Sequence, residues 1–449
     1  MSQVTFVSCG AVTQSPSSQS LSQIMSEEDF VPILREASVD FLSLLGHLGR
    51  GGDEVNKLFI FTLLKESEKL ENLLDDHGAR LNLKFLYFSE MVASVRNFCL
   101  AGFQIFHVVE RYNDYISPSS DTVRREFENE AQKVVAYFLR VLARFHESLL
   151  VEAKALGMEV AFEPIPQEAW KFKPTPKLPY TIDGVKAEKP EERIISIAQA
   201  YRRVFRQFRQ SGLQRRIKAA DISEIVPTRI NETMMADFES QLHNIQSDYD
   251  THIKGSLSES NNPWTVTLRG LTAIPMHLFE SLSWLIHFYE RHENQSRNEV
   301  GARISEMVDN PELLKVITSF GLTHCGRYLA EGNEVAERIL SMYITPITYE
   351  LPLPKPQGFH ARPATYVSLI VQEHGTDTFL IHDGKKYSCR SVLELLEAGG
   401  MLADNKATTA IFEGDKRCLD DIKILSKHNY CEDRDIPPEL HYLRILRNM

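Results

Sequence analysis

Apolar residues recur every three to four positions through most of the first 343 residues, and this spacing is typical of amphipathic helices rather than strands. The first such run places them at Val31, Leu34, Val39, Phe41, Leu42, Leu45 and Leu48. Gly51-Gly52 and Ser117-Pro118 interrupt the pattern, and Gly157 is a candidate C-cap. Helices are therefore expected at about 27–48, 53–76, 81–115 and 120–157. Four long helices with short connections predict an antiparallel bundle over residues 27–160.

The next segment, residues 161–190, reads as a Pro-rich linker because each proline removes a backbone donor and disfavours helix. A second helical block is expected over residues 191–343, with turns at Asn262-Pro263 and Asn310-Pro311. Residues 1–26 are rich in Ser and Thr and read as a flexible arm. The large N-terminal region is thus predicted to be all-α, as two helical bundles or as one elongated bundle.

Composition excludes some classes of protein. The 449 residues carry a formal net charge of -11, which disfavours nucleic acid and anionic membranes as general partners. The chain has no uninterrupted run of 18 apolar residues, and Met1 to Gln23 lacks the charged start of a secretory signal. The six cysteines form no CxxC pair, which favours reduced thiols. A cytoplasmic protein is expected.

The stretch that carries chemistry runs from Gly358 to Thr365, Gly-Phe-His-Ala-Arg-Pro-Ala-Thr. Pro363 suits the first turn of a helix, so His360 is expected just before a helix N-terminus. Free N–H groups gather at such a helix N-terminus, which here comprises Ala361, Pro363 and Ala364, and favour an anion. Arg362 adds a cation that grips phosphate oxygens. A neutral imidazole at this place is a nucleophile that accepts a phosphoryl group.

This signature resembles the active site of HPr, the phosphocarrier of the bacterial phosphotransferase system. The resemblance covers residues 344–431 and includes a hairpin turn at Asp383-Gly384 and a serine, Ser391, 31 residues after His360. It implies an α/β open-faced sandwich, a four-stranded antiparallel sheet covered on one face by three helices. Residues 432–449 are expected to form a C-terminal tail.

The resemblance also implies a function. His360 would accept a phosphoryl group from an enzyme I-like donor and pass it to an acceptor protein, with Arg362 stabilising the phosphate. The chain would act as a phosphohistidine carrier rather than as a turnover enzyme, and no cofactor is predicted. Docking would use the apolar residues Val392, Leu393 and Leu396. The sequence departs from the family at Leu369, Gln372 and Glu394, where cations or small polar residues are frequent, and this favours a dedicated partner.

Ser391 has two interpretations. In part of the HPr family this serine is a regulatory phosphorylation site. Ser391 and Glu394 also fit a capping box at the start of a helix, which accounts for both residues. The residues that follow Ser391 differ from the kinase-recognised pattern, so the cap is preferred.

The helical region resembles no family that we recognise. The motif H-x-x-E-R occurs twice, with His107 and Glu110 in the first block and His287 and Glu290 in the second. Related bundles or chance similarity both explain the repetition. The two pairs are weak candidates for metal ligands, and polar contacts within the helices are the simpler interpretation. A basic run either binds RNA, DNA or an acidic partner, or pairs with carboxylates of the bundle, which is the preferred interpretation in an acidic protein. The run comprises Arg193, Arg202, Arg203, Arg206, Arg209, Arg215, Arg216 and Lys218.

Two alternatives to the phosphocarrier therefore stay open. One is a non-catalytic interaction protein that uses the HPr-like domain for docking. The other is a metal- or cofactor-dependent helical enzyme with a regulatory HPr-like domain.

Overall fold

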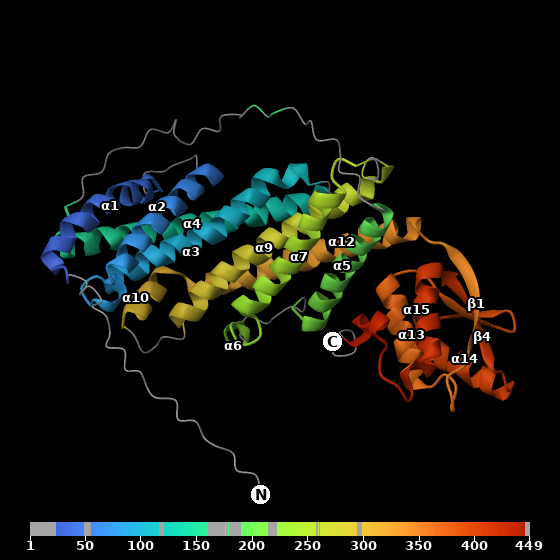
Figure 1. Cartoon of the computed structure of the whole chain (residues 1–449). Coiled ribbons are helices and arrows are strands. Elements are labelled where there is room, and N and C mark those ends of the chain that lie inside the picture. Colours follow the sequence, from blue (N-terminus) through green and yellow to red (C-terminus); the bar gives the residue numbers. More distant parts are fainter. Residues whose placement is uncertain are drawn as a thin grey trace, which may run out of the picture.

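A computed structural model describes the chain over residues 24–48, 55–115, 121–159, 176, 178, 190–213, 222–256, 259, 261–293 and 299–444. The expected arm before residue 24 and nearly all of the Pro-rich segment lie outside these residues. The described chain forms an elongated helical body followed by a C-terminal domain that contains the sheet (Figure 1).

The first half of the helical body is a ring of four long helices. Each helix begins and ends within a few residues of its predicted position, and the four are α1 (Glu27–Leu48), α2 (Lys57–Asp76), α3 (Leu86–Arg111) and α4 (Asp121–Ala155). Short 3-10 turns at η1 (Ala79–Leu81) and η2 (Tyr112–Asp114) flank α3. Neighbours in sequence pack together, and α1 also packs on α4, which closes the ring.

The second half repeats this arrangement. Its ring consists of α5 (Pro190–Ser211), α7 (Glu232–His252), α9 (Pro263–Glu293) and α12 (Thr323–Met342), and α5 packs on α12 as α1 packs on α4. Shorter elements fill the connections: α6 (Ile222–Ile225), α10 (Glu299–Met307), α11 (Asn310–Lys315) and the π-helix η4 (Val316–Leu322). The wider π turn accommodates Leu282, which lies so close to Gly321 that a Cβ there would clash.

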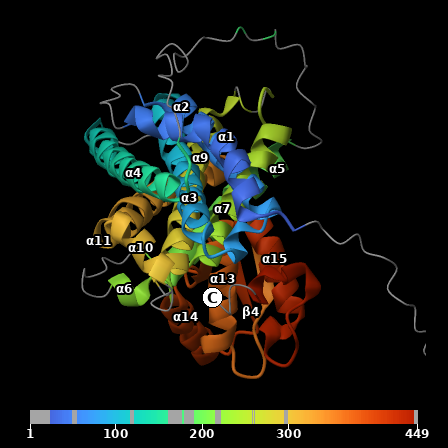
Figure 2. The same ribbon diagram turned by 90° about the vertical axis from the view of Figure 1, so that its left-hand side faces the viewer.

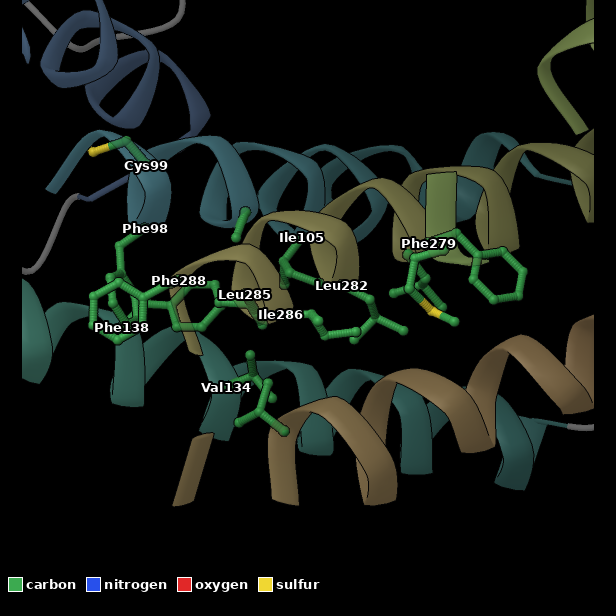
Figure 3. Close-up of a cluster of buried hydrophobic side chains, with 14 of the residues drawn as sticks. Phe98, Cys99, Ile105, Val134, Phe138, Phe279, Leu282, Leu285, Ile286 and Phe288 are labelled. Carbon is green, nitrogen blue, oxygen red and sulfur yellow. The ribbon is translucent and has the colours of Figure 1, made fainter. Parts of the chain in front are cut away.

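The two rings share one core, because α3 packs along α9. The helices run antiparallel: Ser281 bonds to the Ala101 carbonyl near the middle, and Arg291 pairs with Glu90 towards the start of α3. Aromatic side chains fill this seam, with Phe98 packed edge-on against Phe288 at a centroid distance of 5.0 Å (Figure 3). One buried cluster extends from Phe30 to Leu340. Of the two predicted arrangements, the structure has the single elongated body (Figure 1), which Figure 2 shows from the end that holds α1 and α2.

Helix α3 with its 3-10 extension, Leu86–Asp114, is long and apolar enough to cross a membrane. Its apolar window is 72% buried among the other helices. It therefore has the environment of a core helix, which is consistent with a soluble protein.

The C-terminal domain contains a four-stranded antiparallel sheet in the order β1-β4-β2-β3. The strands are β1 (Pro346–Pro352), β2 (Phe379–His382), β3 (Lys385–Ser388) and β4 (Thr409–Asp415). One row of paired residues, Tyr349, Phe412, Leu380 and Tyr387, crosses all four strands. The β2–β3 hairpin turns at Asp383-Gly384, and both residues have positive φ, as the sequence predicts.

Three helices cover one side of this sheet (Figure 1), namely α13 (Ala361–His374), α14 (Val392–Asp404) and α15 (Lys416–Lys427). The predicted tail adds to the core of the domain, since Ile436, Leu440 and Leu443 are buried in it. This segment includes the turns η5 (Asn429–Cys431) and η6 (Pro438–Leu440). The packed domain thus continues to at least Leu443, beyond the expected end at Cys431.

The C-terminal domain is attached to the body at the last turn of α13. Arg203 and Arg206 of α5 bind the two carboxylate oxygens of Glu373, and Arg202 donates to the Gln372 carbonyl at 2.9 Å. The C-cap Gly375, with φ of 70°, leaves the space that Arg202 occupies. These basic residues therefore pair with a carboxylate and a helix C-terminus, whereas Arg215, Arg216 and Lys218 lie outside the described residues.

Candidate functional site

His360 is the N-cap of α13, in extended conformation with φ of -109°. Its carbonyl accepts the first helical hydrogen bond, from Ala364 N at 3.1 Å. The N–H groups of Ala361 and Arg362 precede that bond and point out of the helix end. The His360 side chain is 34% exposed, so a partner can reach it. Pro363 and Ala364 are buried in the first turn and fix the helix on the domain core.

Glu432 lies directly against His360, with Oε2 at 2.8 Å from Nε2 of the imidazole. A carboxylate at Nε2 favours the tautomer that carries its proton there, which leaves the lone pair on Nδ1. The other carboxylate oxygen, Oε1, is buried and has no hydrogen-bond partner among the described residues. The imidazole is therefore oriented by a largely buried anion and keeps one nitrogen for chemistry.

Arg362 points back to the same segment, since its Nη1 donates to the Glu432 carbonyl at 2.9 Å. The side chain is exposed, and the guanidinium keeps further N–H groups for an incoming anion. His360, Arg362 and the helix N-terminus thus surround one small region of surface. An anion bound there meets backbone donors, a fixed cation and a nucleophilic nitrogen.

A strained turn carries Glu432 to this place. Asn429, Tyr430 and Cys431 all have positive φ, between 51° and 58°, which costs about 1 kcal/mol or more for each residue. The Asn429 amide holds the turn by bonding both the N–H and the carbonyl of Lys355 at 2.8 Å. Tyr430 anchors it from within, since its hydroxyl donates to the Pro352 carbonyl. Sequence reasoning missed Glu432 because no local pattern links it to a histidine 72 positions earlier.

The predicted docking residues lie on α14, next to the loop of His360. Gly399 lets that helix approach, because a Cβ there would lie 2.5 Å from the Phe359 carbonyl. Leu393 is 79% exposed, and Val392 and Leu396 are partly buried against the core. Leu393, an exposed apolar side chain in the first turn of α14, is suited to contact with another protein.

Ser391 is the N-cap of α14, and its Oγ accepts a hydrogen bond from Glu394 N at 3.3 Å. The Glu394 carboxylate bonds to Ser388 N at 2.8 Å instead of Ser391 N. The serine cap is therefore present, but the reciprocal half of the capping box is not formed. The hydroxyl has a structural role in this state.

The two H-x-x-E-R pairs are not brought together. Glu110 accepts from Lys57 N at the start of α2, and Glu290 accepts from Glu232 N at the start of α7. The His107 ring lies 4.4 Å from that of His277, and His287 bonds to Glu232. In the described part of the chain no group of three or more His, Cys, Asp or Glu side chains has the arrangement of a metal site. Each pair holds the N-terminus of a neighbouring helix.

The buried histidines of the body have lowered pKa values. Burial, followed by the charges of Lys57 and other neighbours, lowers the pKa of His277 to about 3. Burial, followed by Arg291, lowers the pKa of His292 to about 4. Both imidazoles are neutral at pH 7, His292 is buried and His277 is half-buried, so they are poor candidates for transfer chemistry.

Comparison of the chain with models of known protein families, with curated proteins and with solved structures finds no match. The assignment of function therefore depends on the geometry around His360 and on the signature that surrounds it.

Proposed function

We propose that this chain is a cytoplasmic phosphohistidine carrier of the HPr type, with a helical body that binds partners or senses a signal. The observation that carries the proposal is the contact of Glu432 with His360 Nε2, which leaves Nδ1 as the nucleophile at a helix N-terminus. The order of strands and helices in the C-terminal domain supports it, since three helices cover one face of a four-stranded antiparallel sheet as the resemblance implies.

In the proposed reaction, Nδ1 of His360 attacks the phosphorus of a phosphohistidine on an enzyme I-like donor. A new N–P bond forms as the N–P bond of the donor breaks, and the donor imidazole leaves with that electron pair. Positive charge develops on the His360 ring, and the Glu432 carboxylate stabilises it through the Nε2 proton. Arg362 and the N–H groups of α13 stabilise the phosphoryl oxygens. Reversal of these steps delivers the group to an acceptor protein.

The test is phosphorylation of the purified chain, read by intact mass. Phosphoramidate serves as a small phosphoryl donor that needs no protein recognition, and enzyme I with phosphoenolpyruvate serves as the protein donor. We expect one acid-labile phosphoryl group on the wild type and none on His360→Ala, whereas His374→Ala is phosphorylated normally. Equal labelling of His360→Ala, or no labelling of the wild type by either donor, would refute a carrier and favour the docking role.

The role of Glu432 has its own test. Glu432→Gln keeps a hydrogen-bond acceptor near Nε2 but removes the charge, so the rate of phosphorylation by phosphoramidate should fall by about tenfold. Glu439→Gln, a nearby change of the same kind, is the control and should leave the rate unchanged. An unaltered rate in Glu432→Gln would show that the carboxylate has no part in the reaction.

A further inference from the structure

The two four-helix rings contain the same polar motif at equivalent places. An asparagine caps α2 in the first ring and α7 in the second, Asn56 and Asn231, and each accepts a hydrogen bond from the third residue of its helix. The residue after each asparagine donates its N–H to the glutamate of an H-x-x-E-R motif, on α3 in the first ring and on α9 in the second. Its side chain contacts Nδ1 of the histidine in that motif.

The two copies differ in the charge of that one residue. In the first ring it is Lys57, whose ammonium lies 2.6 Å from His107 Nδ1 and 4.9 Å from the centre of the Phe103 ring. In the second ring it is Glu232, whose Oε2 lies 2.8 Å from His287 Nδ1. The first ring thus supplies its own ammonium to the motif, and the second ring places a carboxylate there.

A cavity lies beside the carboxylate of the second copy. Its volume is about 460 Å³, enough for a small organic molecule, and it opens between the ends of α3, α7, α9 and α10. It is lined by Leu86, Glu90, Glu232, His287, Glu290, Arg291, His292, Val300 and Gly301. Three carboxylates face one guanidinium, and that guanidinium pairs with Glu90 at 2.9 Å. Within the described part of the chain, Glu232 and Glu290 have no Lys or Arg partner: Glu232 contacts His287, and Glu290 accepts the Glu232 N–H.

We infer that this cavity binds a small organic cation with two amino groups, which supplies the ammonium that Lys57 provides in the first ring. Glu232 and Glu290 would each take a charged nitrogen, and Leu86 and Val300 would contact the carbon chain between them. An alkyl diamine matches both the two carboxylates that have no Lys or Arg partner among the described residues and the mixed polar and apolar lining. This binding site is independent of His360 and of the phosphoryl transfer proposed above.

The experiment is isothermal titration calorimetry of the full chain with 1,4-diaminobutane at low ionic strength. The uncharged 1,4-butanediol is the matched probe. We expect saturable binding of one diamine and no binding of the diol. Glu232→Lys gives the second ring the residue that the first ring has at this place, so the helix should still form while diamine affinity falls by at least about tenfold. Glu334→Lys makes the same change of charge on an exposed part of α12 and should bind as the wild type does.

Several outcomes would overturn the inference: no saturable binding by the wild type, equal binding of the diol, or equal losses in Glu232→Lys and Glu334→Lys. Equal losses in the two variants would mean that the affinity for the diamine depends only on the net charge of the protein. The thermal midpoint of each variant shows whether it is folded. If Glu232→Lys is unfolded, Glu232→Gln replaces it, since glutamine keeps an acceptor for His287 and removes only the charge. Unchanged affinity in that variant would also refute the site.

Discussion

Two histidines of the helical body, His277 and His292, and one of the C-terminal domain, His360, lie in contrasting environments. In the body, His292 is buried and His277 is half-buried, and burial with neighbouring charges keeps both imidazoles neutral at pH 7. In the C-terminal domain, His360 stands at a helix N-terminus, partly exposed, with one nitrogen held by Glu432. The packing around them engages the two body histidines, whereas His360 keeps one ring nitrogen without a hydrogen-bond partner among the described residues.

The largest effect on stability is expected at the contact between the body and the C-terminal domain. Burial alone would raise the pKa of Glu373, but Arg206 and Arg203 hold it below its usual value, so the carboxylate is charged between them. Glu373→Ala leaves these cations without their partner and should lower the free energy of unfolding by about 3 kcal/mol. Urea denaturation should then show separate transitions for body and domain. Glu334→Ala, in an exposed position, is the control, and a change as small as in that control would mean that the regions are held together elsewhere.

The lowered pKa values of His277 and His292 predict an effect of pH on the stability of the body. The folded pKa of His277 is far below its unfolded value of about 6.5, so the unfolded chain binds more protons as the pH falls. Stability is then complete above pH 6.5 and decreases below it, by about 1.4 kcal/mol at pH 5.5 for each such histidine. His277→Gln should flatten the pH dependence of the urea midpoint, while His441→Gln, at an exposed site of the C-terminal domain, should not. Identical slopes in both variants would contradict the assigned cause.

The smallest effect is expected at Ser391, within the C-terminal domain. Loss of the helix cap in Ser391→Ala should cost about 1 kcal/mol of unfolding free energy, whereas Ser391→Asp retains a capping oxygen and should cost little. Thermal unfolding of the two variants measures the difference. If Ser391→Ala is as stable as the wild type, the hydroxyl is not needed as a cap, and the regulatory interpretation of this serine gains support.

Local patterns in the sequence predict most of the helices, and tertiary contacts decide the rest. The four helices of the first ring follow from apolar spacing and from breakers such as Ser117-Pro118, which act within a few residues. The π-helix at Val316–Leu322 could not be predicted, because it depends on Leu282 packing against Gly321 from another helix. The buried residues after Cys431 carry too short and irregular a pattern to reveal that they belong to a core.

The candidate site likewise contains residues that the sequence predicts and residues that it does not. His360, Arg362 and the following helix are visible in eight consecutive residues, since Pro363 marks the helix start. The role of Glu432 cannot be predicted from the sequence, because its position depends on a turn of three residues with positive φ. Only the assembled domain stabilises that turn. The shared core of the two rings is hidden for a related reason. The apolar faces of α3 and α9 indicate burial but not the helix against which each one packs.

Helix α13 has His360 at its first turn and the arginines of α5 at its last, about 20 Å apart along a single rigid element. The His360 imidazole is thereby fixed in distance and direction from the whole helical body. In the proposed carrier, a protein bound to the body would meet His360 as an intramolecular neighbour, at an effective concentration set by this geometry. An acceptor held at the wrong distance along the body would then be excluded, even if its own surface fitted the histidine.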